Sequence, residues 1–199
     1  MPENALSEWI FRIVYLTGIV AEIVIRAPIN RRRHKSKVVV SRFDRQEGLL
    51  LLLLFFGGYF MPLLYIFTPW LDFADYVLPT WAGWPGVFFL VAAVVLFWRS
   101  HIDLGTNWSP TLELHENHTL VTRGVYRYIR HPMYASQWLW TVAQALLLQN
   151  WIAGVGGIVC FALFYFSRVA REEQLMLERF GDEYRNYMNR TGRILPHRS

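Results

Sequence analysis

The sequence predicts an all-α integral membrane protein with about five transmembrane helices and a C-terminal helical hairpin. Its 199 residues are 54% hydrophobic and 17% aromatic, which is too apolar for an ordinary soluble domain. The hydrophobic residues gather in five runs, of which the second reaches the roughly 20 residues that a helix needs to cross a bilayer core of about 30 Å. Lys and Arg gather between these runs, a pattern typical of membrane topology. Because lipid offers no partner to backbone polar groups, we expect every span to be helical.

Three candidate spans lie in the first half of the chain. They run from about Trp9 to Ile25, from Gly48 to Thr68, and from about Trp84 to Trp98. Arg12 and Glu22 interrupt the first span. These two residues pair with each other, face a partner, or mark a helix that lies at the membrane interface.

The fourth and fifth candidate spans are Ala135–Leu148 and Trp151–Phe166. Only the dipeptide "QN" separates them, and so short a connection implies a helical hairpin. The polar tail that follows continues the helical pattern past the membrane. Gly181 predicts the end of this helix, and Asp182 predicts the start of a second, short helix.

Loop charge predicts the orientation of the chain. Residues 26–45 carry eight Lys or Arg, whereas residues 69–83 carry none. Residues 99–134 and the tail after residue 166 are basic again. The excess of positive charge places both long loops and the C-terminus in the cytoplasm and the N-terminus outside. The basic loop would also attract anionic membrane lipid.

Composition excludes several classes of protein. The net charge is +5, but no zinc finger or RNA-binding motif accompanies the basic residues, so we expect no nucleic-acid partner. Cys160 is the only cysteine, which excludes a disulfide framework. The start of the chain lacks a basic region and a small-residue cleavage site, so we expect no cleavable signal peptide.

Candidate chemical groups lie just before the fourth span and just after the fifth. The short hairpin brings these two points together, so we expect His131 and Tyr134 to lie near Arg168 and Glu172. Arg168 and Glu172 are four residues apart and share a helix face. They form an ordinary surface pair with a snorkelling Arg, or a functional pair at the membrane edge. His131, ahead of Pro132, is a helix-start residue or a functional one.

Other chemical motifs are missing from the sequence. His115 and His118 are three residues apart, but no Cys accompanies them and no third ligand is apparent, so we expect no metal site. The "GVGG" at residues 154–157 lies within a predicted span, where small residues serve helix packing. No G-x-S-x-G motif of a serine hydrolase occurs.

Two segments carry a family resemblance. "HTLVTRGVYRYIRHPMY" at residues 118–134 and "RVAREEQLMLERFGDEYRNY" at residues 168–187 resemble the isoprenylcysteine carboxyl methyltransferase family, whose wider group includes phospholipid N-methyltransferases. The likeness covers about residues 100–196, and the first two spans share only their hydrophobicity. It implies an integral membrane methyltransferase that uses S-adenosylmethionine, releases S-adenosylhomocysteine and has no Rossmann domain. The sequence accordingly has no G-x-G-x-x-G.

The resemblance also implies roles for individual residues. Those that match cofactor-binding positions of the family are His118, Thr119, Leu120, Val121, Tyr126, His131, Pro132, Met133, Tyr134 and Glu172. Arg168 matches the Arg placed at the methyl acceptor, and Arg168 and Glu172 are the catalytic candidates. Glu173 directly follows Glu172, so which of the two faces the pocket stays open. Residues 1–99 would form three spans and a basic loop, and residues 100–199 the catalytic region.

In this scheme a lipophilic small-molecule acceptor enters from the bilayer and the cofactor binds in a pocket on the cytoplasmic side. Arg168 would hold an acceptor carboxylate and His131 the carboxylate of the cofactor, while Tyr126 and Tyr134 would pack on its adenine or ribose. Eukaryotic members of the family carry additional spans. The acceptor therefore stays open between a carboxylate, an amine and another lipid-like nucleophile, as does the oligomeric state.

Two other hypotheses remain. Membrane sterol reductases resemble this family in their C-terminal half and use NADPH, but they carry more spans and polar motifs for the second phosphate, which this sequence lacks. A non-enzymatic scaffold or small transporter would explain the spans and the loop charges equally well. It would not explain why ionisable and aromatic groups gather at both ends of one hairpin.

Overall fold

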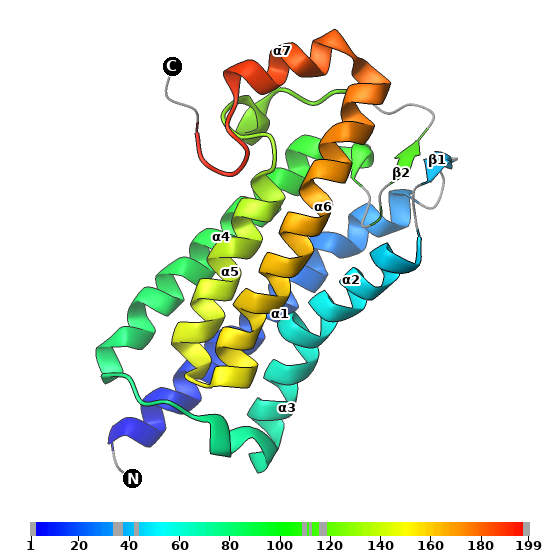
Figure 1. The fold of residues 1–199 in the computed structure, drawn as a ribbon. Helices are drawn as coiled ribbons and strands as arrows, with labels where there is room; N and C mark the ends of the chain where they lie inside the picture. The colour runs from blue at the N-terminus through cyan, green and yellow to red at the C-terminus, as the bar shows by residue number, and fades with distance from the viewer. Residues whose placement is uncertain are drawn as a thin grey trace.

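The computed structural model describes residues 3–33, 38–41, 44–108, 111, 113–115 and 119–196. The long helices lie side by side in one bundle, and the short helix α7 crosses one end of it (Figure 1). The α-helices are α1 (Glu3–Arg33), α2 (Arg45–Phe55), α3 (Met61–Phe67), α4 (Gly83–Leu104), α5 (Pro132–Leu148), α6 (Gly156–Phe180) and α7 (Asp182–Arg190). The π-helical segments are η1 (Phe56–Phe60) and η6 (Trp151–Val155). The 3-10 turns are η2 (Pro69–Ala74), η3 (Thr80–Ala82), η4 (Gly105–Asn107) and η5 (Gly124–Arg127).

Three helical segments of the described chain are long and apolar enough to cross a membrane. They are Arg45–Phe67, Thr80–Leu104 and Trp151–Phe180, at the predicted second, third and fifth spans. α1 and α5 are not among them. α5 has only 17 residues, and α1 carries Arg12 and Glu22 among its apolar residues.

The two charged residues of α1 do not pair with each other. Arg12 donates a hydrogen bond to the hydroxyl of Tyr65, at 3.2 Å, and its guanidinium lies over the same ring. Glu22 is buried and accepts hydrogen bonds from the hydroxyl of Tyr59 and from the amide of Gln137, at 2.6 Å. Both charges therefore face protein groups, which is how a polar residue is accommodated at membrane depth.

A small antiparallel sheet, which the sequence pattern did not predict, joins the two long loops. Its strands are β1 (Val38–Ser41) and β2 (Glu113–His115), and Ser41 pairs with Glu113. The sheet lies at the end of the bundle near α7 (Figure 1). The loop after α1 and the loop after α4 thus meet at one end of the molecule.

Gln144 on α5 connects three elements inside the bundle. A π-helical turn leaves a backbone carbonyl without its usual helical partner. The fully buried amide of Gln144 donates to the carbonyl of Gly57 in η1, at 2.8 Å, and to that of Ala153 in η6, at 2.6 Å. Its oxygen accepts from the hydroxyl of Tyr15 on α1, at 3.0 Å. The amide of Gln144 therefore gives a hydrogen-bond donor to one carbonyl in each π-helical segment.

The connection between α5 and α6 has two local causes. Gln149 adopts the left-handed conformation that ends many helices, with φ of 46°. The side chain of Asn150 then accepts hydrogen bonds from the backbone N–H groups of Ile152 and Ala153, which caps the next helical segment. The chain reverses within these residues, and α5 and α6 lie side by side (Figure 1).

The far end of α6 follows the sequence prediction. α6 ends at Phe180, and α7 begins at Asp182. Gly181 between them has φ of 53°, a conformation that glycine adopts without a steric penalty. The segment after α7 then folds back on the segment before α5, where the N–H of His131 donates to the carbonyl of Arg193, at 2.8 Å. α7 and this returning segment cover one end of the bundle.

Candidate functional site

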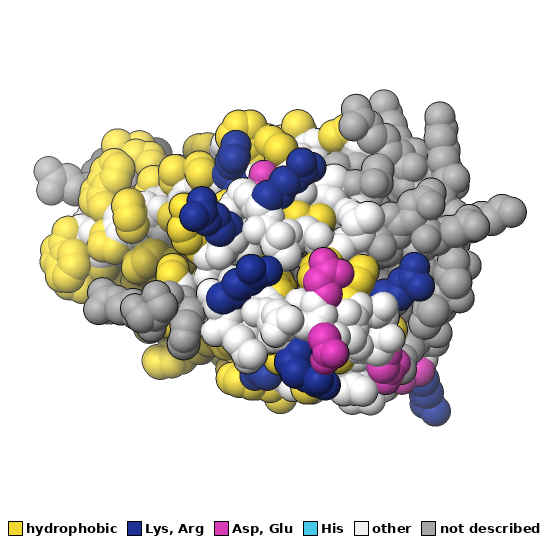
Figure 2. All heavy atoms as spheres, turned by 90° about the horizontal axis from the view of Figure 1, so that it is seen from above, with side chains coloured by type: hydrophobic (Ala, Val, Ile, Leu, Met, Phe, Trp, Pro, Cys, Tyr) yellow, Lys and Arg dark blue, Asp and Glu magenta, His cyan; other side chains and the backbone are white. Residues whose placement is uncertain are grey.

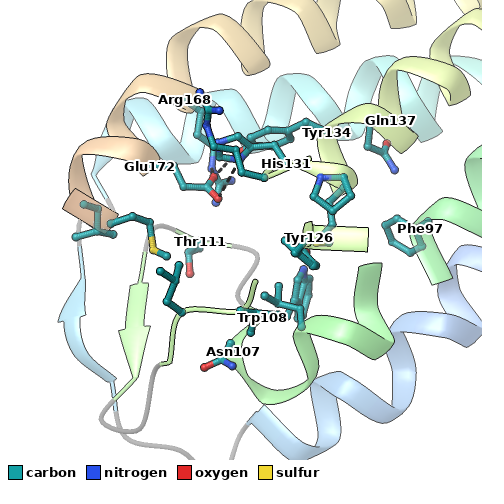
Figure 3. A pocket seen from close by; sticks show the side chains of 18 of the residues that line it. Phe97, Asn107, Trp108, Thr111, Tyr126, His131, Tyr134, Gln137, Arg168 and Glu172 are labelled. Carbon is teal, nitrogen blue, oxygen red and sulfur yellow. Dashed lines mark hydrogen bonds and ion pairs between the residues drawn. The ribbon is translucent and has the colours of Figure 1, made fainter. Parts of the chain in front are cut away.

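A cavity of about 380 Å³ opens between the helices near α7. Figure 3 shows it lined from several elements. Polar side chains from α5 and α6 cluster on one side: Tyr134, Arg168 and Glu172, with His131 beside them. Phe97 and Gln137 lie across the cavity from Arg168 (Figure 3). The cavity therefore offers ionisable groups at one wall and apolar surface at others.

Ten of the residues predicted from the family resemblance line this cavity. They are Thr119, Leu120, Val121, Tyr126, His131, Pro132, Met133, Tyr134, Arg168 and Glu172. They come from two separate stretches of the chain, residues 119–134 and α6, and the fold brings these together. The remaining residue, His118, lies outside the described residues.

Tyr134 and His131 contact Glu172 across the α5–α6 pair, as the short connection led us to expect. The hydroxyl of Tyr134 donates a hydrogen bond to Oε2 of Glu172. Nδ1 of His131 lies 3.8 Å from Oε1 of the same carboxylate. Pro132 occupies the first turn of α5, where its fixed φ suits a helix start, and so directs both side chains toward α6.

Glu172 and Glu173 have different surroundings. Glu172 lines the cavity, and its side chain is 34% exposed. Glu173 is buried and accepts hydrogen bonds from Arg130, at 2.7 Å, and from Arg193, at 2.6 Å, while Nε2 of His131 lies 3.2 Å from it. The carboxylate that faces the cavity is therefore Glu172, and Glu173 joins three chain segments behind it.

Arg168 is also held by a carboxylate from another helix. Its Nη1 lies 3.0 Å from Oε1 of Glu47 on α2, and both residues are buried. Its Nε lies 3.9 Å from Oε2 of Glu172, one helical turn away on α6. The guanidinium also lies over the ring of Phe164. Arg168 thus sits between two carboxylates.

Three tyrosines form the wall of the cavity near α7. Tyr126 is buried, and burial raises its pKa well above the usual value, so its hydroxyl stays neutral. Burial also raises the pKa of Tyr184 and of Tyr187 on α7. The hydroxyl of Tyr187 donates to the backbone carbonyl of Tyr126, which fixes this wall to the turn before α5. Neutral aromatic surfaces of this kind suit a planar ring.

Sequence reasoning did not assign several residues of the cavity wall. Arg26 on α1 lines the cavity with its guanidinium over the ring of Phe97 on α4, and Gln137 lines it from α5. The sequence placed Arg26 in a basic loop, where it served only as a topology signal, but the structure extends α1 through it to Arg33. Tyr184 and Tyr187 were part of the motif that carried the resemblance, and their spacing of three residues on a short helix was the available signal.

Comparisons with known proteins agree with this resemblance. The family model "Isoprenylcysteine carboxyl methyltransferase (ICMT) family" matches residues 86–178. Protein-S-isoprenylcysteine O-methyltransferase of Homo sapiens is 32% identical over 119 residues, which are 59% of this chain and 42% of the human protein. The enzyme of the same name from Dictyostelium discoideum is 28% identical over 131 residues, 65% of this chain and 50% of that protein. This chain therefore covers about half or less of these curated relatives.

A solved structure of the eukaryotic intramembrane Ras methyltransferase ICMT has a similar fold. Its TM-score is 0.53 at 24% sequence identity, over 79% of this chain and 54% of that chain. At this identity the likeness concerns the fold alone. Together with the apolar helices, it identifies the chain as an integral membrane protein. The resemblance to the isoprenylcysteine carboxyl methyltransferase family, which the sequence motifs predicted, is therefore confirmed over residues 86–178.

Proposed function

We propose that this protein is an integral membrane methyltransferase that takes a methyl group from S-adenosylmethionine and transfers it to a lipophilic acceptor. One observation carries the proposal. All the described residues that match cofactor or acceptor positions of the family line one cavity, although they come from two separate stretches of the chain, residues 119–134 and α6. The curated relatives bear the name protein-S-isoprenylcysteine O-methyltransferase, which makes a carboxylate beside a prenyl thioether the first acceptor to test.

The cavity suits the cofactor in size and chemistry. Its volume of about 380 Å³ lies in the range of small-molecule sites, which runs from roughly 300 to 1,000 Å³. S-adenosylmethionine carries a sulfonium and an ammonium group, and Glu172 presents a carboxylate to the cavity. Tyr126 and Tyr134 offer ring surfaces for the adenine or ribose, and Thr119 to Val121 contribute backbone and apolar contacts. When bound, this cofactor supplies a methyl group activated by the positive sulfur.

The chain's own residues would align and shield the reacting groups. Methyl transfer is an in-line displacement, so catalysis rests mainly on positioning and on exclusion of water. Arg168 would hold the acceptor carboxylate, because its guanidinium is permanently charged and planar. Glu172 would hold the cofactor, with Tyr134 fixing the carboxylate by a hydrogen bond. His131 keeps its Nδ1 on the cavity side, where we assign it a cofactor contact.

We propose further that α1 and α5 also cross the bilayer, which gives five spans. Arg12 and Glu22 of α1 are bound to protein groups, and the α5–α6 pair is a hairpin whose ends meet at the cavity. Residues 1–99 then supply three spans, and residues 100–199 supply most of the site. Figure 2 views the end near α7, where Arg, Asp and Glu side chains spread over the face and hydrophobic side chains lie toward its margin. This is the end that the positive-inside pattern assigns to the cytoplasm.

The first test is a calorimetric titration of the detergent-solubilised protein with S-adenosylmethionine, S-adenosylhomocysteine and NADPH. We expect saturable binding of the first two ligands and none of NADPH. Glu172→Gln removes a charged contact and should weaken that binding by at least about tenfold. Glu178→Gln is the matched control, because Glu178 is a carboxylate of the same helix that does not line the cavity.

Two outcomes would contradict the proposal. Binding of NADPH alone would favour a reductase related to the membrane sterol reductases. A folded protein that binds none of the three ligands would favour a scaffold or small transporter. A radiolabelled transfer assay with N-acetyl-S-farnesylcysteine and with an amine lipid then separates a carboxylate acceptor from an amine acceptor.

A further inference from the structure

A buried carboxylate outside the family match contacts the residue that we assign to the acceptor. Glu47 lies in the first turn of α2 and is fully buried. Its Oε1 is 3.0 Å from Nη1 of Arg168, which is itself only 5% exposed. The family model matches residues 86–178 and so does not include Glu47. The contact therefore adds a residue from the N-terminal half to the site.

The ion pair with Arg168 is the main polar contact of the Glu47 carboxylate. Among the described residues, no side chain or backbone group donates a conventional hydrogen bond to either of its oxygens. A buried carboxylate is costly unless a cation accompanies it, so the pair with Arg168 is what keeps the charge of Glu47 in place. The same reasoning holds for the guanidinium, which faces Glu47 on one side.

The fold also fixes where Glu47 points. Asp44 caps the start of α2 by accepting a hydrogen bond from the backbone N–H of Glu47, at 2.7 Å. Asp44 also accepts from Nη2 of Arg171 on α6, at 2.6 Å. Two ion pairs therefore hold the first turn of α2 against α6, an exposed one at Arg171 and a buried one at Arg168. Only the buried pair involves a residue of the cavity wall.

A competing position for the guanidinium lies close by. Nε of Arg168 is 3.9 Å from Oε2 of Glu172, which faces the cavity from the next turn of α6. Without Glu47, Glu172 would be the nearest carboxylate to the guanidinium. A move toward it would occupy the carboxylate assigned to the cofactor and turn the donors of Arg168 away from the acceptor. Glu47, at 3.0 Å, is the closer of the two carboxylates.

We propose that Glu47 is a positioning residue that holds the guanidinium of Arg168 in the orientation needed to bind the acceptor. This inference rests on the proposed function, because it presumes that Arg168 meets the acceptor. Glu47 itself does not line the cavity, so it acts through Arg168 alone. The acceptor's full negative charge is present before methyl transfer and disappears with it. Loss of the orientation therefore weakens acceptor binding and appears mainly in KM.

The test compares three variants in the methyl-transfer assay with N-acetyl-S-farnesylcysteine. We expect Glu47→Gln to raise the acceptor KM by at least about tenfold and to leave the Kd of S-adenosylhomocysteine within about twofold of wild type. Glu47→Asp keeps the charge and should give a KM between those of wild type and Glu47→Gln. Arg171→Gln removes the exposed pair between the same helices, leaves the Asp44 cap on Glu47 in place and is the matched control, with an unchanged acceptor KM.

Each outcome decides between the two proposals. Wild-type protein that binds no cofactor and transfers no methyl group refutes the proposed function. Active wild type with Glu47→Gln indistinguishable from Arg171→Gln refutes the role of Glu47 alone. A lower acceptor KM in Glu47→Gln also refutes it, because Glu47 would then compete with the acceptor for Arg168. If Glu47→Gln does not fold, Glu47→Asp carries the test, with an unchanged KM as the contradicting result.

Discussion

At the start of α5, Arg130 and His131 contact the carboxylate of Glu173, whereas near its end the neutral amide of Gln144 binds backbone carbonyls. His131, Glu173 and Gln144 are buried. The first of these two clusters lies at the end of the bundle that carries α7, beside the cavity. The second lies next to core residues such as Leu147, away from the cavity lining. α5 is thus held by ionic contacts at its start and by hydrogen bonds from an uncharged amide near its end.

The difference follows from what each end must do. Near the cavity a charged side chain can be buried because side chains of opposite charge contact it there, as Arg130 contacts Glu173. Deeper in the bundle, a neutral amide satisfies the carbonyls without the cost of removing an ion from water. Losing one partner should therefore cost most at the charged end, where it leaves an unpaired ion, and less at the neutral end.

The largest expected effect is at the charged end. Glu173→Gln removes a buried carboxylate and leaves Arg130, whose side chain is 10% exposed, without its ionic partner, which should lower the free energy of unfolding by about 3–5 kcal/mol. Denaturant unfolding in detergent, followed by circular dichroism, measures the change. Glu178→Gln, on the exposed side of the same helix, should stay within about 0.5 kcal/mol of wild type. A loss below about 1 kcal/mol in Glu173→Gln would contradict the comparison.

The neutral end should respond less. Gln144→Leu leaves the carbonyls of Gly57 and Ala153 without their donor, at an expected cost of about 2 kcal/mol. The same unfolding assay measures it. Val142→Ala, an exposed position on the same helix, should change stability by less than about 0.5 kcal/mol and serves as the control. If Gln144→Leu lowered the free energy of unfolding as much as Glu173→Gln does, the charged and neutral ends of α5 would not differ in their contribution to stability.

The cap after α5 should contribute a smaller amount. Asn150→Ala removes the acceptor for two backbone N–H groups and the donor to the carbonyl of Leu71, and should cost about 1–2 kcal/mol. Asn150→Ser keeps a capping acceptor without placing a second carboxylate beside Asp75, to which Asn150 also donates, and should lose less than Asn150→Ala. Equal losses in the two variants would show that the contacts with Leu71 and Asp75 dominate. Thermal unfolding of the two variants side by side separates these outcomes.

The smallest effect is expected at the contact between Glu22 on α1 and Gln137, which lies midway along α5. Glu22→Gln should cost less than about 1 kcal/mol, because an amide can still accept from Gln137 and can donate to the hydroxyl of Tyr59. Unfolding in detergent measures this value as well. A loss near that of Glu173→Gln would mean that the charge of Glu22 has an ionic partner of its own.

Part of this arrangement could be predicted from the sequence. The dipeptide between the last two spans implied that His131 and Tyr134 meet Glu172, and the structure has these contacts. Gly181 marked the end of α6 correctly. Both inferences use residues that are close in sequence or joined by a short connection, where local geometry leaves few alternatives.

Contacts between distant segments could not be predicted in the same way. Glu47 looked like one more charged residue at the edge of a span, and only the packing of α2 on α6 brings it to Arg168. Gln144 lay in an apolar run with no sign that π-helical segments would need its amide. The distinction between Glu172 and Glu173 likewise depends on Arg193, which reaches Glu173 from beyond α7.

The returning segment at residues 191–193 sets an order of events during synthesis. It pairs with Arg130 and His131, which the ribosome has made some 60 residues earlier. At about 5–20 residues per second, roughly 3–12 s pass between the two. During that interval Glu173 is synthesised before Arg193, its partner from beyond α7. The contacts that close this end of the pocket can therefore form only after α5 and α6 have been made.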